Sequence, residues 1–327
     1  MSVTPAAQLA AVLEAGGPSL RAGLERVEER LAEVAESHGA ELGRHATSTL
    51  TAGGKRLRPL LVFLCGGRGN GLVSAAVAVE LLHTATLVHD DVLDAAALRR
   101  GHVTVFAAGG RLAATATGDL LFSRAFAELA AGAGREAVAA LSTASSALAQ
   151  GELMQRADAW SDTVSAERYL ERCELKTASL FAESCRLGAL LGDSDPGLAT
   201  VLAGFGRRIG LAFQILDDVL DVSGPAERTG KHRGADLLDG TVTLPLIIAR
   251  ERDAGLQAMD LRSLVTEPAQ AAAVCDRVAI TGALHEARSE ALNHVSEAKA
   301  SLTGADLPDE RRHALNLVAD SVVERYA

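Results

Sequence analysis

The chain has 327 residues, of which 48% are hydrophobic and only 3% aromatic. A core so poor in aromatic rings must consist mainly of Ala, Leu and Val, which favours packed helices over β-sandwiches. The net charge of -10 argues against a nucleic-acid binder that relies on a broad basic surface. The four cysteines form no C-x-x-C pair, so we expect no disulfide framework and a cytoplasmic protein.

Hydrophobic periodicity predicts one helix after another along the chain. The predicted helices cover residues 20–42, 60–65, 72–97, 113–131 and 135–157. Glycine and proline clusters separate such stretches at 53–54, 66–71, 109–110, 132–134, 192–197 and 224–234. No stretch alternates apolar and polar residues as a half-buried strand would. The pattern predicts a single all-α domain over residues 1–327, with residues 1–19 as a loosely ordered N-terminal segment.

Neither a signal peptide nor a membrane span is expected. The N-terminus lacks the early basic cluster and long apolar run of a secretory signal. The longest apolar runs, such as 60–65 and 244–249, are far shorter than the roughly 20 residues that a spanning helix needs.

The pentapeptide Asp-Asp-Val-Leu-Asp occurs twice, at Asp90–Asp94 and at Asp217–Asp221. Residues three and four apart share a helix face, so each copy places its carboxylates together. One such triplet is usually a solvated face or a helix cap, but a second identical copy in an apolar stretch is hard to explain in that way. Hard divalent cations such as Mg²⁺ prefer oxygen ligands and bind through a few carboxylates plus substrate phosphates. The repeat therefore predicts a metal site.

Basic residues accompany both acidic copies. Arg99 and Arg100 follow the first copy, Lys231 follows the second, and Gly53–Pro59 (GGKRLRP) precedes an apolar helix. Glycine permits close backbone approach, and Lys and Arg supply charge-assisted hydrogen bonds to phosphate. Each basic residue alone is more often a surface residue. Together with two acidic clusters, and without a Walker A or G-x-G-x-x-G motif, they point to diphosphates bridged by metal.

These motifs resemble those of the trans-isoprenyl diphosphate synthases, or polyprenyl synthases, from about Leu24 to the C-terminal helix. The matching segments are GGKRLRPLL (53–61), ELLHTATLVHDDVLDAAALRRG (80–101), GDLLFSRAF (118–126), LKTASLF (175–181), GLAFQILDDVLD (210–221) and GKHRGADLLDGTVTLPL (230–246). The resemblance implies the isoprenoid synthase fold, an antiparallel helix bundle around a deep central cavity. It also implies a homodimer whose two aspartate motifs face each other at the cavity mouth.

By the same resemblance, each site residue acquires a role. Asp90, Asp94 and Asp217 would ligate Mg²⁺ directly, with Asp91, Asp218 and Asp221 completing the shell. The resemblance implies three Mg²⁺ per active site, for which Mn²⁺ can substitute. Arg99, Lys176 and Lys231 would bind the allylic diphosphate, and Lys55, Arg58, His83 and Arg100 would bind isopentenyl diphosphate. Gln214 would orient the reacting groups, and Thr177 would lie near the forming carbocation.

The reaction that the resemblance implies begins when metal and basic residues stabilise the departing diphosphate, which leaves an allylic cation. The isopentenyl double bond attacks this cation, and the released diphosphate removes a proton. Water must be excluded, so an apolar tunnel is expected beneath the charged mouth. The substrates are the only implied partners besides a second copy of the chain. No nucleic acid is expected, and any membrane contact would be transient and mediated by the lipophilic product.

Product length is expected to depend on the tunnel. Ala85 and Thr86 stand five and four residues before Asp90, where short-chain members of the family carry bulky aromatics. These small side chains favour a product beyond geranylgeranyl, in the hexaprenyl to decaprenyl range. Phe122 and Phe126 are candidate deeper floors, although residues of this kind are more often plain core. A geranylgeranyl diphosphate synthase is the alternative.

Two further classes stay open as remote alternatives. A class I terpene cyclase carries an Asn/Ser/Glu metal motif in place of the second aspartate motif, which is intact here. A regulatory subunit of a heteromeric synthase typically loses aspartates, and none is lost. The chain departs from the family pattern in two places, and neither departure removes an expected ligand. His102-Val103-Thr104 lacks the usual proline, and Ala95–Ala97 stand in place of acidic residues.

Overall fold

The computed structural model describes residues 5–51, 56–99, 101–192, 197–224 and 232–324, and almost all of them are helical. The first half of the chain forms α1 (Pro5–Ala15), α2 (Gly17–Glu36), α3 (Ala40–Thr51), α4 (Leu57–Gly66), α5 (Leu72–Leu93), α6 (Val105–Gly132) and α7 (Gly134–Ala157). The next part forms α8 (Ala166–Cys173), the π-helix η1 (Glu174–Ala178), α9 (Ser179–Leu191) and α10 (Leu198–Ser223). The last part forms α12 (Ala235–Asp239), α13 (Leu244–Arg252), α14 (Ala254–Gln257), α15 (Leu261–Leu264), α16 (Pro268–Ile280), α17 (Ala283–Thr303) and α18 (Asp309–Glu324). The predicted all-α fold is confirmed.

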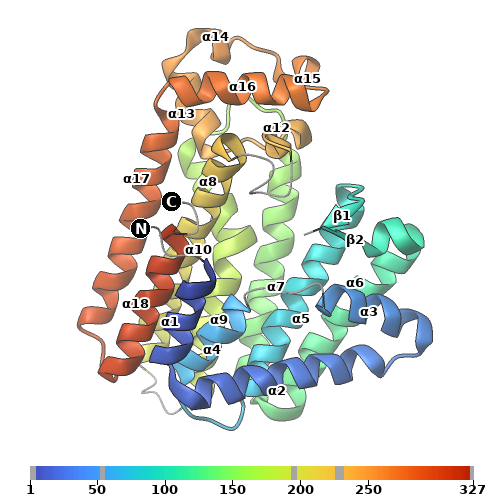
Figure 1. Ribbon diagram of the computed structural model, residues 1–327, viewed down its shortest axis with the longest axis vertical. Coiled ribbons are helices and arrows are strands. Elements are labelled where there is room, and N and C mark those ends of the chain that lie inside the picture. The colour runs from blue at the N-terminus through green and yellow to red at the C-terminus, as the bar shows by residue number, and fades with distance from the viewer. Residues whose placement is uncertain (1–4, 52–55, 100, 193–196, 225–231, 325–327) are drawn as a thin grey trace.

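The long helices lie side by side as a bundle, with α5, α7, α9 and α10 in its interior (Figure 1). Helix α5 packs against α6, and α10 packs against α9 and α17. Both α5 and α10 are buried over most of their length. A helix that is apolar on nearly all sides belongs in a core, as α5 does, whereas α10 keeps a polar stripe that includes Arg207, Gln214 and Asp217. The aspartate motifs lie at the C-terminal ends of these two buried helices.

Helix α5 is long and apolar enough, by length and composition, to cross a membrane, although the sequence analysis found no such run. Within the bundle, 67% of the apolar window is buried. We therefore assign α5 as a core helix.

Two glycines allow the π-helix η1 to approach its neighbours closely. A Cβ on Gly151 of α7 would lie 2.6 Å from the backbone N of Lys176, and one on Gly210 of α10 would lie 2.6 Å from Cα of Ala178. Real Cβ atoms do not come so near to backbone, so η1 is held between α7 and α10 at a distance that only glycine permits. This packing fixes where Lys176 and Thr177 lie.

Several boundaries differ from the sequence expectations. The predicted helix over 20–42 is divided into α2 and α3 at Ser37–Gly39, where Gly39 has a φ of +81°. The break expected at residues 109–110 is instead a kink inside α6, at Gly110. The expectation of no strand was wrong at one place. Strands β1 (Leu98–Arg99) and β2 (His102–Val103) pair antiparallel directly after the first motif. The turn at Gly101, with a φ of +79°, joins them.

The N-terminal part of the chain also differs from the expected loose segment. Helix α1 packs against α18 near the C-terminus. Val12 of α1 is buried in the core, so this helix is part of the bundle.

Candidate active site

The first aspartate motif occupies the last turn of α5. Asp94 is the C-cap residue, and its backbone N–H donates to the carbonyl of Asp90 (2.8 Å). The C-terminus of a helix carries a partial negative charge, so carboxylates there are unfavourable without positive partners. Asp221 in the second motif lies in the last turn of α10, the same setting. Positive partners therefore stabilise carboxylates at these two positions.

Two arginines supply part of that positive charge in the first motif. Arg99 on β1 donates from Nε to Oδ1 of Asp91 (2.7 Å), and Asp91 is only 4% exposed. The β1–β2 turn therefore serves to return Arg99 to the motif. Arg156, in the last turn of α7, donates from Nη2 to Asp94. Asp90 has no such ion pair among the contacts of the described residues. Burial raises the pKa of Asp90 to about 6, although the charge of Lys176 acts in the opposite direction.

The second motif is organised around Asp218, which is only 3% exposed. Its Oδ2 accepts a hydrogen bond from the Tyr169 hydroxyl (2.7 Å), and its Oδ1 accepts one from Nε2 of Gln214 (2.8 Å). Both donors are neutral. Burial raises the pKa of Asp218 well above its ordinary value, and the hydrogen bonds from Tyr169 and Gln214 lower it only in part.

Asp221 has a different environment. Its carboxylate accepts from the backbone N–H of Ala235 (3.1 Å) and, at 3.3 Å, from that of Asp236. These amides begin helix α12, so Asp221 caps that helix and fixes the segment that follows the second motif. Asp217 is exposed at the surface of the site.

Lys176 and Thr177, consecutive residues of η1, connect the two motifs. Nζ of Lys176 is paired with Glu152 and donates to Oε1 of Gln155 (3.1 Å). Burial raises the pKa of Asp90, and the charge of Lys176 acts to lower it. The Thr177 hydroxyl donates to Oε1 of Gln214 (2.7 Å), and Nε2 of Gln214 in turn donates to Oδ1 of Asp218. Single-turn π-helices often occur at functional sites because they turn side chains out of the α-helical register. Here η1 presents neighbouring side chains to the two motifs.

A pocket lies beside the first motif, between α3, α5 and the β1–β2 ribbon. It encloses about 540 Å³ of space, part of it open to solvent. Its lining includes Arg56, Glu80, His83, Asp91, Arg99 and His102. The predicted His83 lies here. Arg56, which the sequence analysis gave no role, crosses the pocket wall to Glu80 (2.7 Å) and Glu28 (2.6 Å).

The other predicted binding residues are placed only in part. The Arg58 guanidinium lies 4.5 Å from the ring centroid of Phe181 and is half-buried. Lys55, Arg100 and Lys231 lie outside the described residues. Among the chain-length candidates, Ala85 is fully buried, and Thr86 donates to the carbonyl of His83 (2.8 Å). The rings of Phe122 and Phe126 contact each other, with centroids 5.5 Å apart.

The donors present fit a hard divalent cation. All are carboxylate oxygens, and the pKa of Asp90 and that of Asp218 are raised because burial disfavours the charged form, which a bound cation would stabilise. Within the described parts of the chain, no three acidic, His or Cys side chains already converge on one point. Arg99 and Arg156 hold Asp91 and Asp94 instead. A metal ion at the first motif would compete with these two arginines for the same carboxylates.

Four site residues were missed by the sequence analysis. They are Glu152, Gln155, Arg156 and Tyr169. The first three do leave a signal, since residues 152, 155 and 156 share one face near the end of a predicted helix. A polar face of this kind is equally typical of a helix exposed to solvent. Only the contacts with Lys176 and Asp94 show that these residues belong to the site. Tyr169 leaves no signal beyond being one of two tyrosines in the chain.

Comparisons with known proteins agree on the family. Residues 40–280 match the Polyprenyl synthetase family. The chain is 36% identical over 292 residues to heptaprenyl diphosphate synthase component 2 of Geobacillus stearothermophilus, covering 88% of this chain and 91% of that protein. It is 34% identical over 296 residues to geranylgeranyl diphosphate synthase of Methanosarcina mazei, covering 87% and 90%.

A solved structure is similar as well. The polyprenyl synthase of Caulobacter crescentus, complexed with calcium and isoprenyl diphosphate, superposes with a TM-score of 0.88 at 33% identity, over 100% of this chain and 99% of that one. The fold and the two aspartate motifs thus define an isoprenoid synthase, of a family that uses divalent metal. The chain belongs to the Polyprenyl synthetase family and is a prenyltransferase, a trans-prenyl diphosphate synthase.

Proposed function

We propose that this enzyme joins isopentenyl diphosphate to geranyl, farnesyl or geranylgeranyl diphosphate by trans head-to-tail (1′-4) condensation, with release of diphosphate. The observation that carries the proposal is that two consecutive residues of η1 are each linked to a different motif. Burial raises the pKa of Asp90 and the charge of Lys176 acts to lower it, while Thr177 is linked through hydrogen bonds of Gln214 to Asp218. One short element thus couples two acidic motifs that lie far apart in the sequence, as a site for a single bound diphosphate would need.

The chain's own residues would bind and orient the allylic diphosphate. Asp90, Asp94 and Asp217 are the proposed direct ligands of Mg²⁺, with Asp91, Asp218 and Asp221 as supporting ligands, and we propose three ions per site with Mn²⁺ as a substitute. When bound, these ions would supply electrostatic stabilisation of the departing diphosphate. Arg99, Lys176 and Lys231 would add charge-assisted hydrogen bonds to the same group. Thr177, buried beside Gln214, would present its oxygen to the reacting carbon.

Isopentenyl diphosphate would bind on the side of the first motif where the pocket lies. His83 lines this pocket together with Arg99. Lys55, Arg58 and Arg100 are the other proposed contacts. Arg56 supports this side by its ion pairs with Glu28 and Glu80, which hold α2, α4 and α5 together. Because Arg58 stacks on Phe181, its guanidinium is held at the boundary between the charged site and the apolar core.

We further propose a product longer than geranylgeranyl diphosphate, with Ala85 and Thr86 leaving the tunnel open and Phe122 or Phe126 as its floor. Ala85 is fully buried on α5, the helix that carries the first motif, so a bulky side chain there would enter the apolar interior. Likeness to a heptaprenyl diphosphate synthase component supports this length. A geranylgeranyl diphosphate synthase is the second candidate, supported by 34% identity to the Methanosarcina enzyme.

The whole chain is proposed to act as one catalytic domain and as a homodimer in the cytoplasm, with at most transient membrane contact through the lipophilic product. The four cysteines, Cys65, Cys173, Cys185 and Cys275, all belong to the described residues, are buried and form no disulfide, as suits a reducing compartment. A heteromeric assembly is the alternative, because the Geobacillus relative is named component 2. Elongation by the purified chain alone would argue against an obligate partner.

The decisive experiment incubates the purified protein with Mg²⁺, isopentenyl diphosphate and each of the three allylic primers. Radiolabelled products are then separated by chain length. We expect elongation beyond geranylgeranyl, and products that stop at twenty carbons would favour the second candidate. Asp90→Ala and Asp217→Ala are expected to lower turnover by orders of magnitude. Absence of elongation with every primer, or release of cyclised hydrocarbons only, would overturn the proposal.

A further inference from the structure

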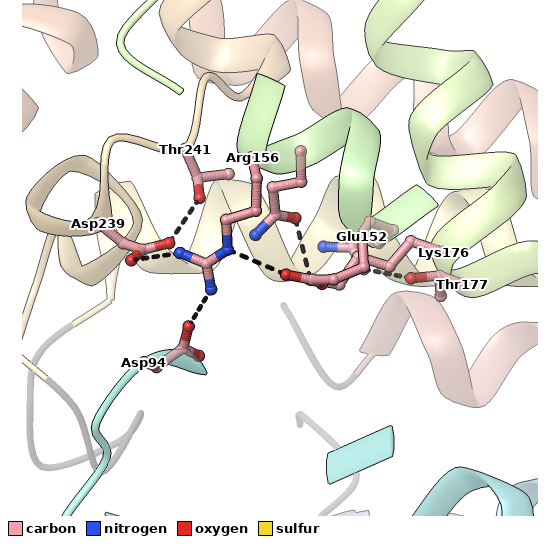
Figure 2. Close-up of polar contacts among 9 residues, drawn as sticks. Asp94, Glu152, Arg156, Lys176, Thr177, Asp239 and Thr241 are labelled. Atoms are coloured by element: carbon pink, nitrogen blue, oxygen red, sulfur yellow. Dashed lines mark hydrogen bonds and ion pairs between the residues drawn. The ribbon is translucent and has the colours of Figure 1, made fainter. Parts of the chain in front are cut away.

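Arg156, which lies outside the matching family segments, is at the centre of a charged cluster (Figure 2). Each of its three guanidinium nitrogens contacts a carboxylate from a different part of the chain. Nη2 contacts Asp94 at the end of α5, Nε contacts Glu152 one turn earlier on α7 (3.1 Å), and Nη1 contacts Asp239 at the end of α12 (3.4 Å). One side chain therefore connects the first aspartate motif to the segment that follows the second.

The charge balance of this cluster is negative. Asp94, Glu152 and Asp239 are matched by only two cations, Arg156 and Lys176, and these two share Glu152. Burial raises the pKa of Glu152, but Lys176 and Arg156 outweigh this effect and lower its pKa overall. Glu152 thus remains charged and holds both cations toward the motifs.

Arg156 already occupies Oδ1 of Asp94, so a metal ion at this carboxylate would have to bind through Oδ2 or displace the guanidinium. The guanidinium lies in direct contact with Oδ1 of Asp94, and its positive charge disfavours a second cation at the same carboxylate. The ion pair is also weak enough to exchange. Arg156 and Asp94 are 35% and 40% exposed, and ion pairs at that exposure contribute little to stability because solvent screens them.

The released guanidinium would remain near the site. Glu152 is on the same helix, one turn away, and would keep the Arg156 side chain beside Lys176. A planar guanidinium matches the paired oxygens of a diphosphate better than a lysine ammonium does. Arg156 can therefore change partners, from the carboxylate of Asp94 to the anion that arrives with the metal.

We propose that Arg156 is a positioning residue that neutralises Asp94 in the metal-free enzyme and turns to the allylic diphosphate once metal has taken Asp94. This inference rests on the proposed function. It predicts that removing the Arg156 guanidinium changes metal binding and diphosphate binding in opposite directions. Arg156 competes with metal that binds alone, whereas it assists the binding of diphosphate together with metal.

The test compares Arg156→Met, which keeps much of the aliphatic stem, with Arg156→Lys, which keeps the charge without the planar fork. Mn²⁺ binding is measured by electron paramagnetic resonance, first with Mn²⁺ alone and then with inorganic diphosphate at saturating Mn²⁺. For Arg156→Met we expect Mn²⁺ alone to bind about threefold to tenfold tighter and diphosphate to bind about tenfold weaker. Arg156→Lys is expected to lie between the wild type and Arg156→Met in both measurements.

Arg252→Met is the matched control. Arg252 forms an ion pair of similar exposure with Glu286, on α13 and α17, and touches none of the site residues named above. We expect both binding constants of this variant to equal those of the wild type. Thermal unfolding of all variants separates a folding defect from a binding effect. If Arg156→Met does not fold, the two binding constants of Arg156→Lys decide between the outcomes.

A merely structural Arg156 would weaken both binding events or leave both unchanged, and either result would overturn the inference. Elongation by the wild type is measured in parallel. If Arg156→Met changes the two binding constants in the expected opposite directions but the wild type does not elongate, the proposed function fails and the exchange at Asp94 stands. If the wild type elongates and Arg156→Met changes both binding constants in the same direction, only the proposed role of Arg156 fails.

Discussion

The Tyr169 hydroxyl donates a 2.7 Å hydrogen bond to Oδ2 of Asp218, and both side chains are buried. Burial raises the pKa of Asp218, and this hydrogen bond opposes the rise. Tyr169 therefore favours the ionised carboxylate that a metal ion requires, and it fixes the orientation of that carboxylate.

Tyr169→Phe should lower turnover about tenfold to a hundredfold, in the range seen when a partner of a metal ligand is removed. The missing donor leaves Asp218 with Gln214 alone, so its pKa rises further and metal binds less well at a given pH. Steady-state kinetics as a function of Mg²⁺ concentration measures the effect, which should be largest at low Mg²⁺. An unchanged Mg²⁺ dependence would mean that Asp218 does not act through metal.

Gly151→Ala should displace η1. The added Cβ would lie 2.6 Å from N and 2.8 Å from Cα of Lys176, and neither backbone atom can move without moving the π-helix. We expect a loss of about 1–3 kcal/mol in the free energy of unfolding. Turnover should fall by about a hundredfold, because Lys176 and Thr177 would be misplaced. Chemical denaturation and kinetics measure the two effects.

Gly204→Ala provides the comparison for that experiment. Its Cβ would meet only the end of the Arg208 side chain, at 3.5 Å, which is ordinary contact. In the helix α10, replacing this glycine should stabilise the protein by about 0.5–1 kcal/mol and leave turnover unchanged. Equal effects of the two substitutions would show that close packing at η1 is unimportant.

The pKa of Asp90 gives a prediction for pH. Burial raises it from 3.8 to about 6, so the folded, metal-free protein holds this proton more tightly than the unfolded chain does. The resulting destabilisation is absent below pH 3.8, grows as the pH rises toward 6 and is complete above pH 6. Asp90→Asn should therefore stabilise the metal-free protein at pH 7 by on the order of 1 kcal/mol, after allowance for solvent. Thermal unfolding in the presence of a chelator measures this gain.

The same group has the opposite effect on metal binding, because a metal ligand must be deprotonated. Binding of Mn²⁺ to the wild type should weaken as the pH falls through about 6. Asp90→Asn should bind Mn²⁺ poorly at every pH between 5 and 8. A stabilising gain from Asp90→Asn that is as large at pH 4 as at pH 7 would contradict the assignment.

Ala85→Phe should shorten the product while most of the turnover is kept. Ala85 is fully buried on α5, below the first motif, so a phenyl ring would project into the space proposed for the growing chain. Product analysis by reversed-phase chromatography measures the length. Phe126→Ala is the complementary change and should lengthen the product if this ring forms the floor. Unchanged product length in Ala85→Phe would place the floor on another helix.

Much of the architecture could be predicted from sequence, because helix formation and burial leave periodic local signals. The predicted helix over 135–157 corresponds to α7, at Gly134–Ala157, within one residue. The predicted helix over 72–97 was too long, since α5 ends at Leu93 and the chain turns through Ala95, at a φ of +49°. The β1–β2 ribbon could not be predicted, because two-residue strands are too short for an alternating pattern.

The grouping of the carboxylates in the aspartate motifs follows from the amino-acid order. The spacing within Asp90–Asp94 and within Asp217–Asp221 places each set of carboxylates on one helix face, and helix geometry alone requires that. The differences among these carboxylates depend on tertiary contacts. Asp218 is paired with Tyr169, Asp221 caps α12 and Asp94 is held by Arg156. These contacts join residues that are distant in the chain, and they depend on how closely helices pack, for which a single sequence carries no periodic signal.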